Sequence, residues 1–452
     1  MSTAGTLPAA RAIEIACATK RAESETAGRR FSVLRALLLG ALLAAPLTFG
    51  GVEAWAWGTL CLLVSILVVV WVIDSLRRGV LKLAWSPLYV PGVLVLLLGV
   101  VQLASGRTLD PAGSREALVK LSIDFMIFYL VPQFFDAAPQ ETWTRAGLVV
   151  VVFTFALALF AVFQFYSDPT RVFWSVKPRW GGSIFGPYVN HNHYAGLMEM
   201  LIPLSAASAA ARPGGSAKRA LLALAVVLPV ASVLLSGSRG GLVSLLVESL
   251  VACWVYGGAT APRRHFKTAG AALIGVAAAS MLFFWMDTGR VYEHLGTVFE
   301  VRRLPEVGFT ARKMATVDSL RIFRDHLWSG TGLGSFEAAY PAYQSAPSDE
   351  VWDHAHNDYA EALAETGLAG GLLIATALVL FLRLAFSGLR QGMTSPGGAL
   401  RFGATLGCCG LLVHSALDFN LHIPANAAWF AVCAAWATSP PIRGSEGGQE
   451  IS

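Results

Sequence analysis

Runs of about twenty apolar residues recur through most of the chain, and they constrain its fold more than any other feature. A helix needs roughly 20 apolar residues to cross the hydrocarbon core of a bilayer, where every backbone polar group must be hydrogen-bonded within the protein. The 452 residues are 55% hydrophobic and only 14% charged, whereas a soluble domain carries about 25% charged residues. The sequence therefore predicts an all-α integral membrane protein.

About twelve transmembrane helices are expected from these runs. They fall near residues 32–50, 53–73, 86–104, 119–136, 146–166, 194–211, 220–236, 240–258, 268–286, 368–386, 401–417 and 423–439. Lysine and arginine gather in the loops after the second, sixth, eighth and tenth spans, as at Arg77, Arg78, Arg263 and Arg264. Short cytoplasmic loops carry this excess, so both termini are expected in the cytoplasm and the chain is expected to cross the membrane many times.

The same pattern divides the chain into five regions. These are a disordered cytoplasmic tail (1–30), transmembrane helices 1–9 (31–286), a large periplasmic loop (287–367), transmembrane helices 10–12 (368–440) and a cytoplasmic tail (441–452). The loop is expected to be partly helical, because Thr310–Trp328 has helical periodicity and Gly330–Gly334 would end that helix. The cysteines lie in apolar runs or in the first tail, so neither disulfides nor a thiolate metal cluster is expected.

The densest titratable chemistry lies in Asp353–Tyr359, immediately before the tenth span. Imidazole suits proton transfer near neutral pH, and carboxylates beside His354 and His356 could orient a ring for that purpose. A simpler interpretation is a histidine pair that caps the following helix. A third is metal binding, since His354, His356 and Asp358 spell H-x-H-x-D. No further histidine follows before His414, which lies inside a predicted span, and no metal is predicted.

A second candidate is the turn Gly237–Gly241, which carries Arg239 at a membrane boundary. An arginine fork beside accessible backbone donors suits a phosphate or diphosphate. The competing interpretation is an interfacial arginine that reaches up to the lipid headgroups.

The third candidate runs from Lys177 through Arg179 to Asn190-His191-Asn192-His193-Tyr194. Aromatic, amide and basic groups suit sugars, although aromatic belts at membrane interfaces have a similar composition. Acidic residues inside predicted spans, Asp124, Glu199 and Glu248, leave solute transport as an alternative function.

Three separated motifs together resemble one family. Gly181–Tyr194, Ser238–Gly241 and the stretch from His356-Asn357-Asp358-Tyr359 to Glu365-Thr366-Gly367 are similar to the O-antigen ligase and polymerase superfamily. The turn Gly330–Phe336, Arg312 and Asp418-Phe419-Asn420 before Pro424 also follow its pattern. The resemblance covers roughly Trp180 to Asn426, and the earlier spans are generic.

The resemblance implies a membrane glycosyltransferase of the GT-C-like kind in the bacterial inner membrane, with its active site facing the periplasm. Such enzymes take a glycan from an undecaprenyl-diphosphate donor without a metal or other cofactor. The acceptor is another lipid-linked repeat unit for polymerases and lipid A–core for ligases, and the motif is more similar to polymerases. The partners expected are these glycans and membrane lipid, with no nucleic acid.

Specific roles follow for the residues of the three motifs. An acceptor hydroxyl needs a base, for which His356 is the best placed, and the departing diphosphate needs cations, for which Arg239 and Arg312 are the candidates. The expected substrate-binding residues are Arg179, Asn190, His191, Asn192, His193, His354, Asn357, Asp358 and Tyr359.

Overall fold

The computed structural model describes residues 31–79, 83–136, 138–178, 182–212, 215–257, 309–345, 351–390, 393 and 395–439. Within these ranges the fold is helical, and two isolated bridges are its only strand-like pairings. A first helix covers Phe31–Leu47. The others are α2 (Ala54–Arg78), α3 (Tyr89–Ala104), α4 (Pro111–Phe135), α5 (Gln140–Ser167), α6 (His191–Ala210), α7 (Ser216–Ser236), α8 (Arg239–Gly257), α11 (Phe309–Asp325), α12 (Phe336–Ala339), α13 (Asp358–Phe386), α14 (Pro396–His414) and α15 (Pro424–Thr438), with short 3₁₀ turns η1 (Phe49–Gly51), η2 (Tyr340–Ala342) and η3 (Asn420–His422).

Five of the described helices, α2, α4, α5, α13 and α14, are long and apolar enough to cross a membrane. Shorter apolar helices cover Phe31–Leu47, Tyr89–Ala104 and Ala223–Ser236. These helices support a multi-pass membrane protein. Eleven of the twelve predicted spans coincide with helices, while the ninth, 268–286, lies outside the described residues. The count of twelve spans and the GT-C-like fold remain predictions.

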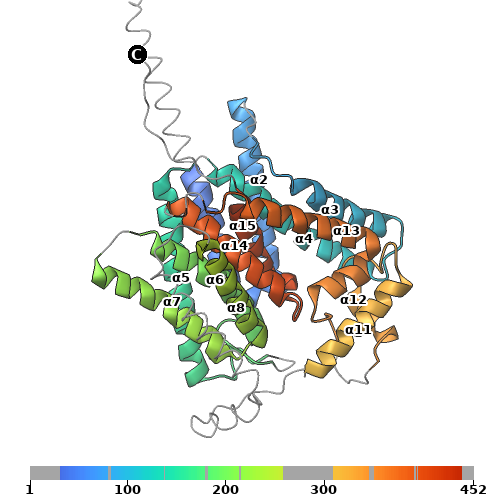
Figure 1. Cartoon of the computed structure of the whole chain (residues 1–452). Coiled ribbons are helices and arrows are strands. Elements are labelled where there is room, and N and C mark those ends of the chain that lie inside the picture. Colours follow the sequence, from blue (N-terminus) through green and yellow to red (C-terminus); the bar gives the residue numbers. More distant parts are fainter. Residues whose placement is uncertain are drawn as a thin grey trace, which may run out of the picture.

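The centre of the helical bundle is α14, which packs against α5, α6, α8 and α15 (Figure 1). Its close approach to α6 depends on Gly403 and Gly407, because a Cβ at these positions would lie 2.6 Å from the carbonyl oxygen of Pro203 and 2.7 Å from Cα of Met200. Small residues at this four-residue spacing let helix backbones approach within a membrane.

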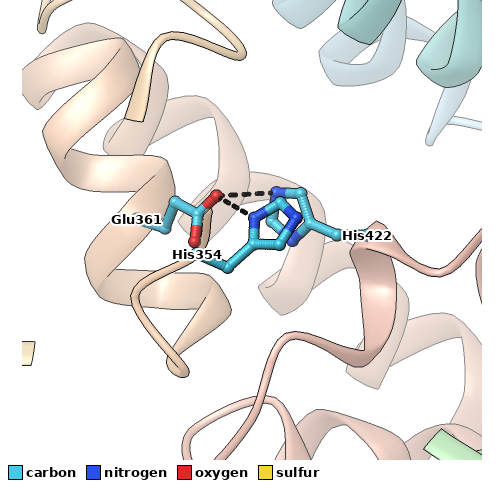
Figure 2. Close-up of side chains that lie close together, drawn as sticks. All are labelled: His354, Glu361 and His422. Atoms are coloured by element: carbon cyan, nitrogen blue, oxygen red, sulfur yellow. Dashed lines mark hydrogen bonds and ion pairs between the residues drawn. The ribbon is translucent and has the colours of Figure 1, made fainter. Parts of the chain in front are cut away.

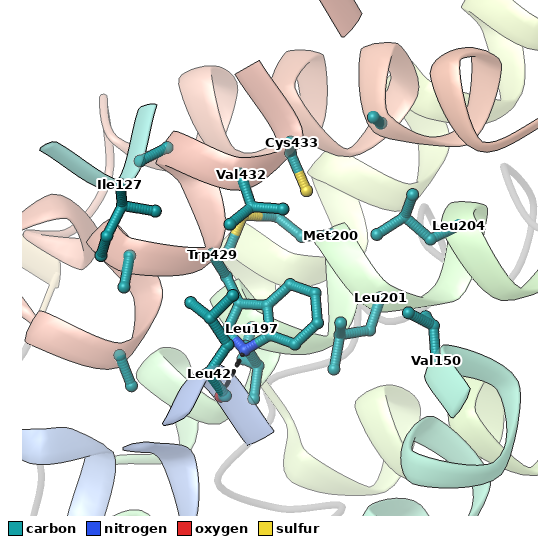
Figure 3. Close-up of a cluster of buried hydrophobic side chains, with 14 of the residues drawn as sticks. Leu42, Ile127, Val150, Leu197, Met200, Leu201, Leu204, Trp429, Val432 and Cys433 are labelled. Atoms are coloured by element: carbon teal, nitrogen blue, oxygen red, sulfur yellow. Dashed lines mark hydrogen bonds between the residues drawn. The ribbon is translucent and has the colours of Figure 1, made fainter. Parts of the chain in front are cut away.

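A buried apolar cluster joins α15 to α4, α5, α6 and the first helix (Figure 3). Trp429 lies at its centre, and the indole N–H donates a hydrogen bond to the carbonyl oxygen of Leu42 at 2.9 Å. The indole is therefore buried with its polar group satisfied, which fixes α15 against the N-terminal part of the bundle.

Helix α13 bends at Gly367, whose φ of 63° and ψ of −162° are not helical. The turn Gly330–Gly334 packs into this bend, and a Cβ on Gly330 would overlap the backbone of Glu365. The amide of Gln102 in α3 donates hydrogen bonds to the carbonyls of Ser329 and Glu365, at 2.6 and 2.9 Å. These contacts place α11 and α12 at the N-terminal end of α13 (Figure 1).

Candidate functional site

The turn that carries His354 and His356 is fixed at the start of α13. Asn357 caps this helix, since its side-chain oxygen accepts hydrogen bonds from the N–H groups of Tyr359 and Ala360, both at 3.1 Å. The Asp358 N–H donates to the Ser415 carbonyl at 2.8 Å. His356 has a φ of 51°, and a non-glycine residue in this left-handed region is strained and depends on its surroundings to hold it there.

Asp418 holds His356 and Arg312 in one arrangement. Nδ1 of His356 lies 3.0 Å from Oδ1 of Asp418, and Nη1 of Arg312 donates to Oδ2 at 3.2 Å. The Phe419 N–H donates to the same carboxylate at 2.9 Å. Burial would raise the pKa of Asp418, but the hydrogen bond from His356 and the charge of Arg312 hold it well below its usual value. Asp418 is therefore a fully buried carboxylate ion.

The N-terminal end of α6 reaches the same place. Asn190 caps α6 by accepting a hydrogen bond from the Asn192 N–H at 2.9 Å, and Nδ1 of His191 lies 2.7 Å from the Ser236 carbonyl. His193 is buried, and its Nε2 lies 3.9 Å from Oδ1 of Asp418. Of the predicted substrate-binding residues here, the structure brings His193 to Asp418 and gives Asn190 and His191 backbone partners.

Arg239 begins α8 on an exposed position beside this centre. A Cβ on the next residue, Gly240, would overlap the imidazole of His414. Nδ1 of His414 lies 3.1 Å from both oxygens of Glu199, and the His414 carbonyl accepts a hydrogen bond from the Asp418 N–H at 3.0 Å. His414 thus links the α8 terminus to Asp418. Arg179 lies outside the described residues.

A second cluster consists of His354, Glu361 and His422 (Figure 2). Nδ1 of His354 and Nε2 of His422 both face Oε1 of Glu361, at 2.7 and 3.2 Å. Nδ1 of His422 also lies 2.9 Å from Oδ1 of Asp358. Burial would lower the pKa of His422, but Glu361 and Asp358 raise it to about 10. The His422 ring is therefore an imidazolium between two carboxylates.

The structure does not assemble the H-x-H-x-D sequence into one metal site. His354 stacks on Phe419 with ring centroids 4.5 Å apart, whereas His356 meets the same ring edge-on at 4.8 Å and pairs with Asp418. A different set, His354, Glu361 and His422, has ligand atoms within 4.8 Å of one another and could hold a metal ion. Binding there would require the His422 ring to lose a proton, because only an unprotonated ring nitrogen ligates a metal.

The second cluster opens into a cavity of about 430 Å³. The cavity lies between α2, α4, α12, the first turns of α13 and the segment that precedes α15. Trp57 and Phe336 contribute aromatic rings, and Lys120 contributes a cation. Carboxylates dominate its charged lining.

Three residues of this centre are absent from the predicted site: Asp418, Glu361 and His422. Asp418 belonged to the motif pattern, and it stands between two apolar runs, at the same membrane face as His356. Its predicted position at the same membrane face as His356 could therefore have suggested that Asp418 belongs to the site. Nothing in the sequence indicated that Glu361 and His422 would meet.

Comparison with protein families agrees with the motif pattern. Residues 224–375 match the family model described as O-antigen ligase. The resemblance to the O-antigen ligase and polymerase superfamily is thereby confirmed. The matched region contains Arg239, Arg312 and the stretch Asp353–Tyr359, whereas His193 and Asp418 flank it. No curated protein matches the chain. The O-antigen ligase family points to a polymerase- or ligase-type enzyme that acts on lipid-linked glycans.

Proposed function

We propose that the protein is a GT-C-like membrane glycosyltransferase that moves a glycan from an undecaprenyl-diphosphate donor to an acceptor on the periplasmic face of the inner membrane. The proposed reaction is polymerisation of repeat units of a surface polysaccharide, either O-antigen or exopolysaccharide. The alternative reaction is that of a ligase, which transfers the polymer to lipid A–core. The observation that carries the proposal is the buried carboxylate of Asp418 between His356 and Arg312.

His356 is the proposed base for the acceptor hydroxyl. An ionised carboxylate only accepts hydrogen bonds, so the proton of the neutral imidazole lies on Nδ1 towards Asp418 and the lone pair lies on Nε2. As the hydroxyl oxygen bonds to the anomeric carbon and the bond to the diphosphate breaks, Nε2 takes the hydroxyl proton. The adjacent Asp418 then stabilises the imidazolium that forms.

Arg239 and Arg312 are the proposed partners of the diphosphate, with Arg179 as a further candidate. The leaving group departs with its negative charge, and fixed cations stabilise that charge without a metal ion. Arg312 also forms an ion pair with Asp418, and Arg239 is the second proposed cation of the clamp. It stands at the N-terminus of α8, where the helix dipole also favours an anion.

Solute transport is the competing function. A transporter site is typically formed near the middle of the membrane by interrupted helices. Here His193, Arg239 and His356 lie at or beside the N-terminal ends of α6, α8 and α13, and Asp418 follows the C-terminal end of α14. This concentration of polar groups at helix ends favours chemistry at one face of the membrane.

The proposal is tested by deleting the gene and separating the surface glycans on a gel. Single repeat units on lipid A indicate a lost polymerase, whereas full-length chains stranded on the lipid carrier indicate a lost ligase. Purified protein must also extend or transfer a glycan from a lipid-linked donor. Protein that moves a solute across vesicles but transfers no glycan would instead establish the transporter.

A further inference from the structure

We infer that the 430 Å³ cavity beside Phe419 receives the terminal sugars of the acceptor, and that it accepts neutral or amine-bearing sugars in preference to anionic ones. This inference rests on the proposed glycosyl transfer and adds to it the location and charge class of the acceptor. The cavity falls within the range of roughly 300–1,000 Å³ typical of small-molecule sites.

The first argument is the combination of groups that line the cavity. Trp57 and Phe336 offer apolar rings, and His354, Glu361 and His422 bring ring nitrogens and carboxylate oxygens to the same space. A sugar presents both an apolar C–H face and a set of hydroxyls, so it needs aromatic surface together with hydrogen-bonding groups. The cavity lining contains both kinds of group.

The second argument is charge. The carboxylates of Asp110, Glu337 and Asp353 line the cavity, and none of them forms a salt bridge with lysine or arginine within the described ranges. Two cations line the cavity, and both are already paired. Lys120 forms an ion pair with Glu116 at 2.6 Å, and the His422 imidazolium lies between Asp358 and Glu361.

This excess of negative charge opposes a phosphate, a diphosphate or a uronate inside the cavity. The donor diphosphate and the sugar bonded to it are therefore excluded from this cavity, because that sugar must lie beside the proposed clamp of Arg239 and Arg312. What remains is the end of the acceptor that is distant from any diphosphate.

The third argument is the position of the cavity relative to the proposed base. His354 lines the cavity and stacks on Phe419, while His356 contacts the same ring edge-on. The two histidines lie two residues apart on a turn fixed by the Asn357 cap. Because the rings of His354 and His356 both contact Phe419, the cavity that His354 lines is next to the turn that carries the proposed base.

The experiment measures binding of three disaccharides to the full-length protein in nanodiscs by equilibrium dialysis. The probes are chitosan disaccharide (cationic), its N-acetylated form (neutral) and a hyaluronan disaccharide (anionic). Wild type should bind the cationic and neutral probes at least about tenfold more tightly than the anionic probe. Equal binding of the anionic and cationic probes would overturn the inference.

Two variants locate the effect. Glu337→Lys reverses an exposed charge of the cavity and should reduce the preference for cationic over anionic probe by about tenfold. The matched control Asp325→Lys reverses an exposed charge at the end of α11, outside the cavity lining, and should leave the preference unchanged. Trp57→Ala should weaken binding of all three probes. A preference that stays the same in Glu337→Lys, or binding that stays the same in Trp57→Ala, would place the sugar elsewhere.

Failure of this inference is distinguishable from failure of the proposed function. If wild type transfers glycan and uses acceptors with uronate ends as well as neutral ones, only the cavity assignment is wrong. If the disaccharides bind as expected but no donor glycan is ever transferred, the glycosyltransferase proposal is wrong while the sugar site stands.

Discussion

Nδ1 of His356 and Oδ1 of Asp418 lie 3.0 Å apart although the two residues are 62 positions apart in the chain. His356 precedes α13 and Asp418 follows α14, so the pair closes a loop formed by two helices. Because Asp418 is fully buried, the proposed base depends on a carboxylate that substrate cannot contact freely.

Asp418→Asn should reduce turnover more than donor binding. An amide at this position no longer stabilises an imidazolium and no longer fixes the proton of His356 on Nδ1, so the rate should fall by about 10²–10⁴-fold. The check is single-turnover glycan transfer by purified protein, together with donor binding. Asp325→Asn, which removes an exposed carboxylate outside the site, is the control and should retain wild-type turnover. Unchanged turnover in Asp418→Asn would remove Asp418 from the mechanism.

Substitutions of His356 and of Arg239 should impair different steps, as seen in donor binding and in turnover. His356→Ala should retain donor binding yet lose turnover by about 10²–10⁴-fold, because it removes only the proton acceptor. Arg239→Ala should weaken donor binding and turnover together, since the diphosphate is charged in both the ground and the transition state. Arg239→Lys should remain impaired, because an ammonium lacks the planar two-donor fork.

Both sets of variants are first checked for normal insertion and folding by size-exclusion chromatography. Donor binding and transfer rates are then measured with the lipid-linked substrate. Wild-type donor affinity and rate in Arg239→Ala would mean that Arg239 is only an interfacial anchor.

Gly240→Ala should lower both stability and activity. The added Cβ would overlap the His414 ring, and overpacking of a buried contact typically costs roughly 1–3 kcal/mol. If α8 moves to relieve this overlap, Arg239 at its N-terminus is displaced as well. The measurement is thermal melting together with transfer rate. Gly58→Ala is the matched control, because nothing lies within 4 Å of a Cβ there, and it should melt no lower than wild type.

Chelation should leave glycan transfer intact. The proposed clamp uses arginines, so EDTA treatment should not lower the rate, and purified protein should carry far less than one equivalent of metal by elemental analysis. If His354, Glu361 and His422 do hold an essential ion, the rate will fall on chelation and return with a divalent cation. Loss of that response in His422→Ala would assign the ion to this cluster.

The sidedness of the large loop is tested by cysteine labelling of intact cells. Val351 is 79% exposed, so Val351→Cys should react with a membrane-impermeant maleimide added from outside. Arg77→Cys, at the predicted cytoplasmic end of α2, should react only after lysis. Labelling of the two positions in the reverse order would invert the predicted topology.

The sequence by itself determined the class of fold and the resemblance to one family. Apolar runs such as 53–73 and 146–166 have only one way to satisfy their backbone in lipid, so they reveal α2 and α5 directly. The motifs also made His356, Arg239 and Arg312 the candidate site residues, because an imidazole suits proton transfer and guanidinium groups suit a diphosphate. Local patterns suffice where a property depends on a residue and its near neighbours.

Only the tertiary structure decided which of these groups act together. It paired His356 with Asp418 and His354 with Glu361 and His422, and thereby separated two histidines that the sequence places two residues apart. It also gave Asn190 and Asn357 capping roles that a polar motif does not distinguish from substrate binding. The physical reason is that these pairings depend on the packing of α6, α13 and α14 around small residues such as Gly407, and such long-range contacts leave no periodic signal in the chain.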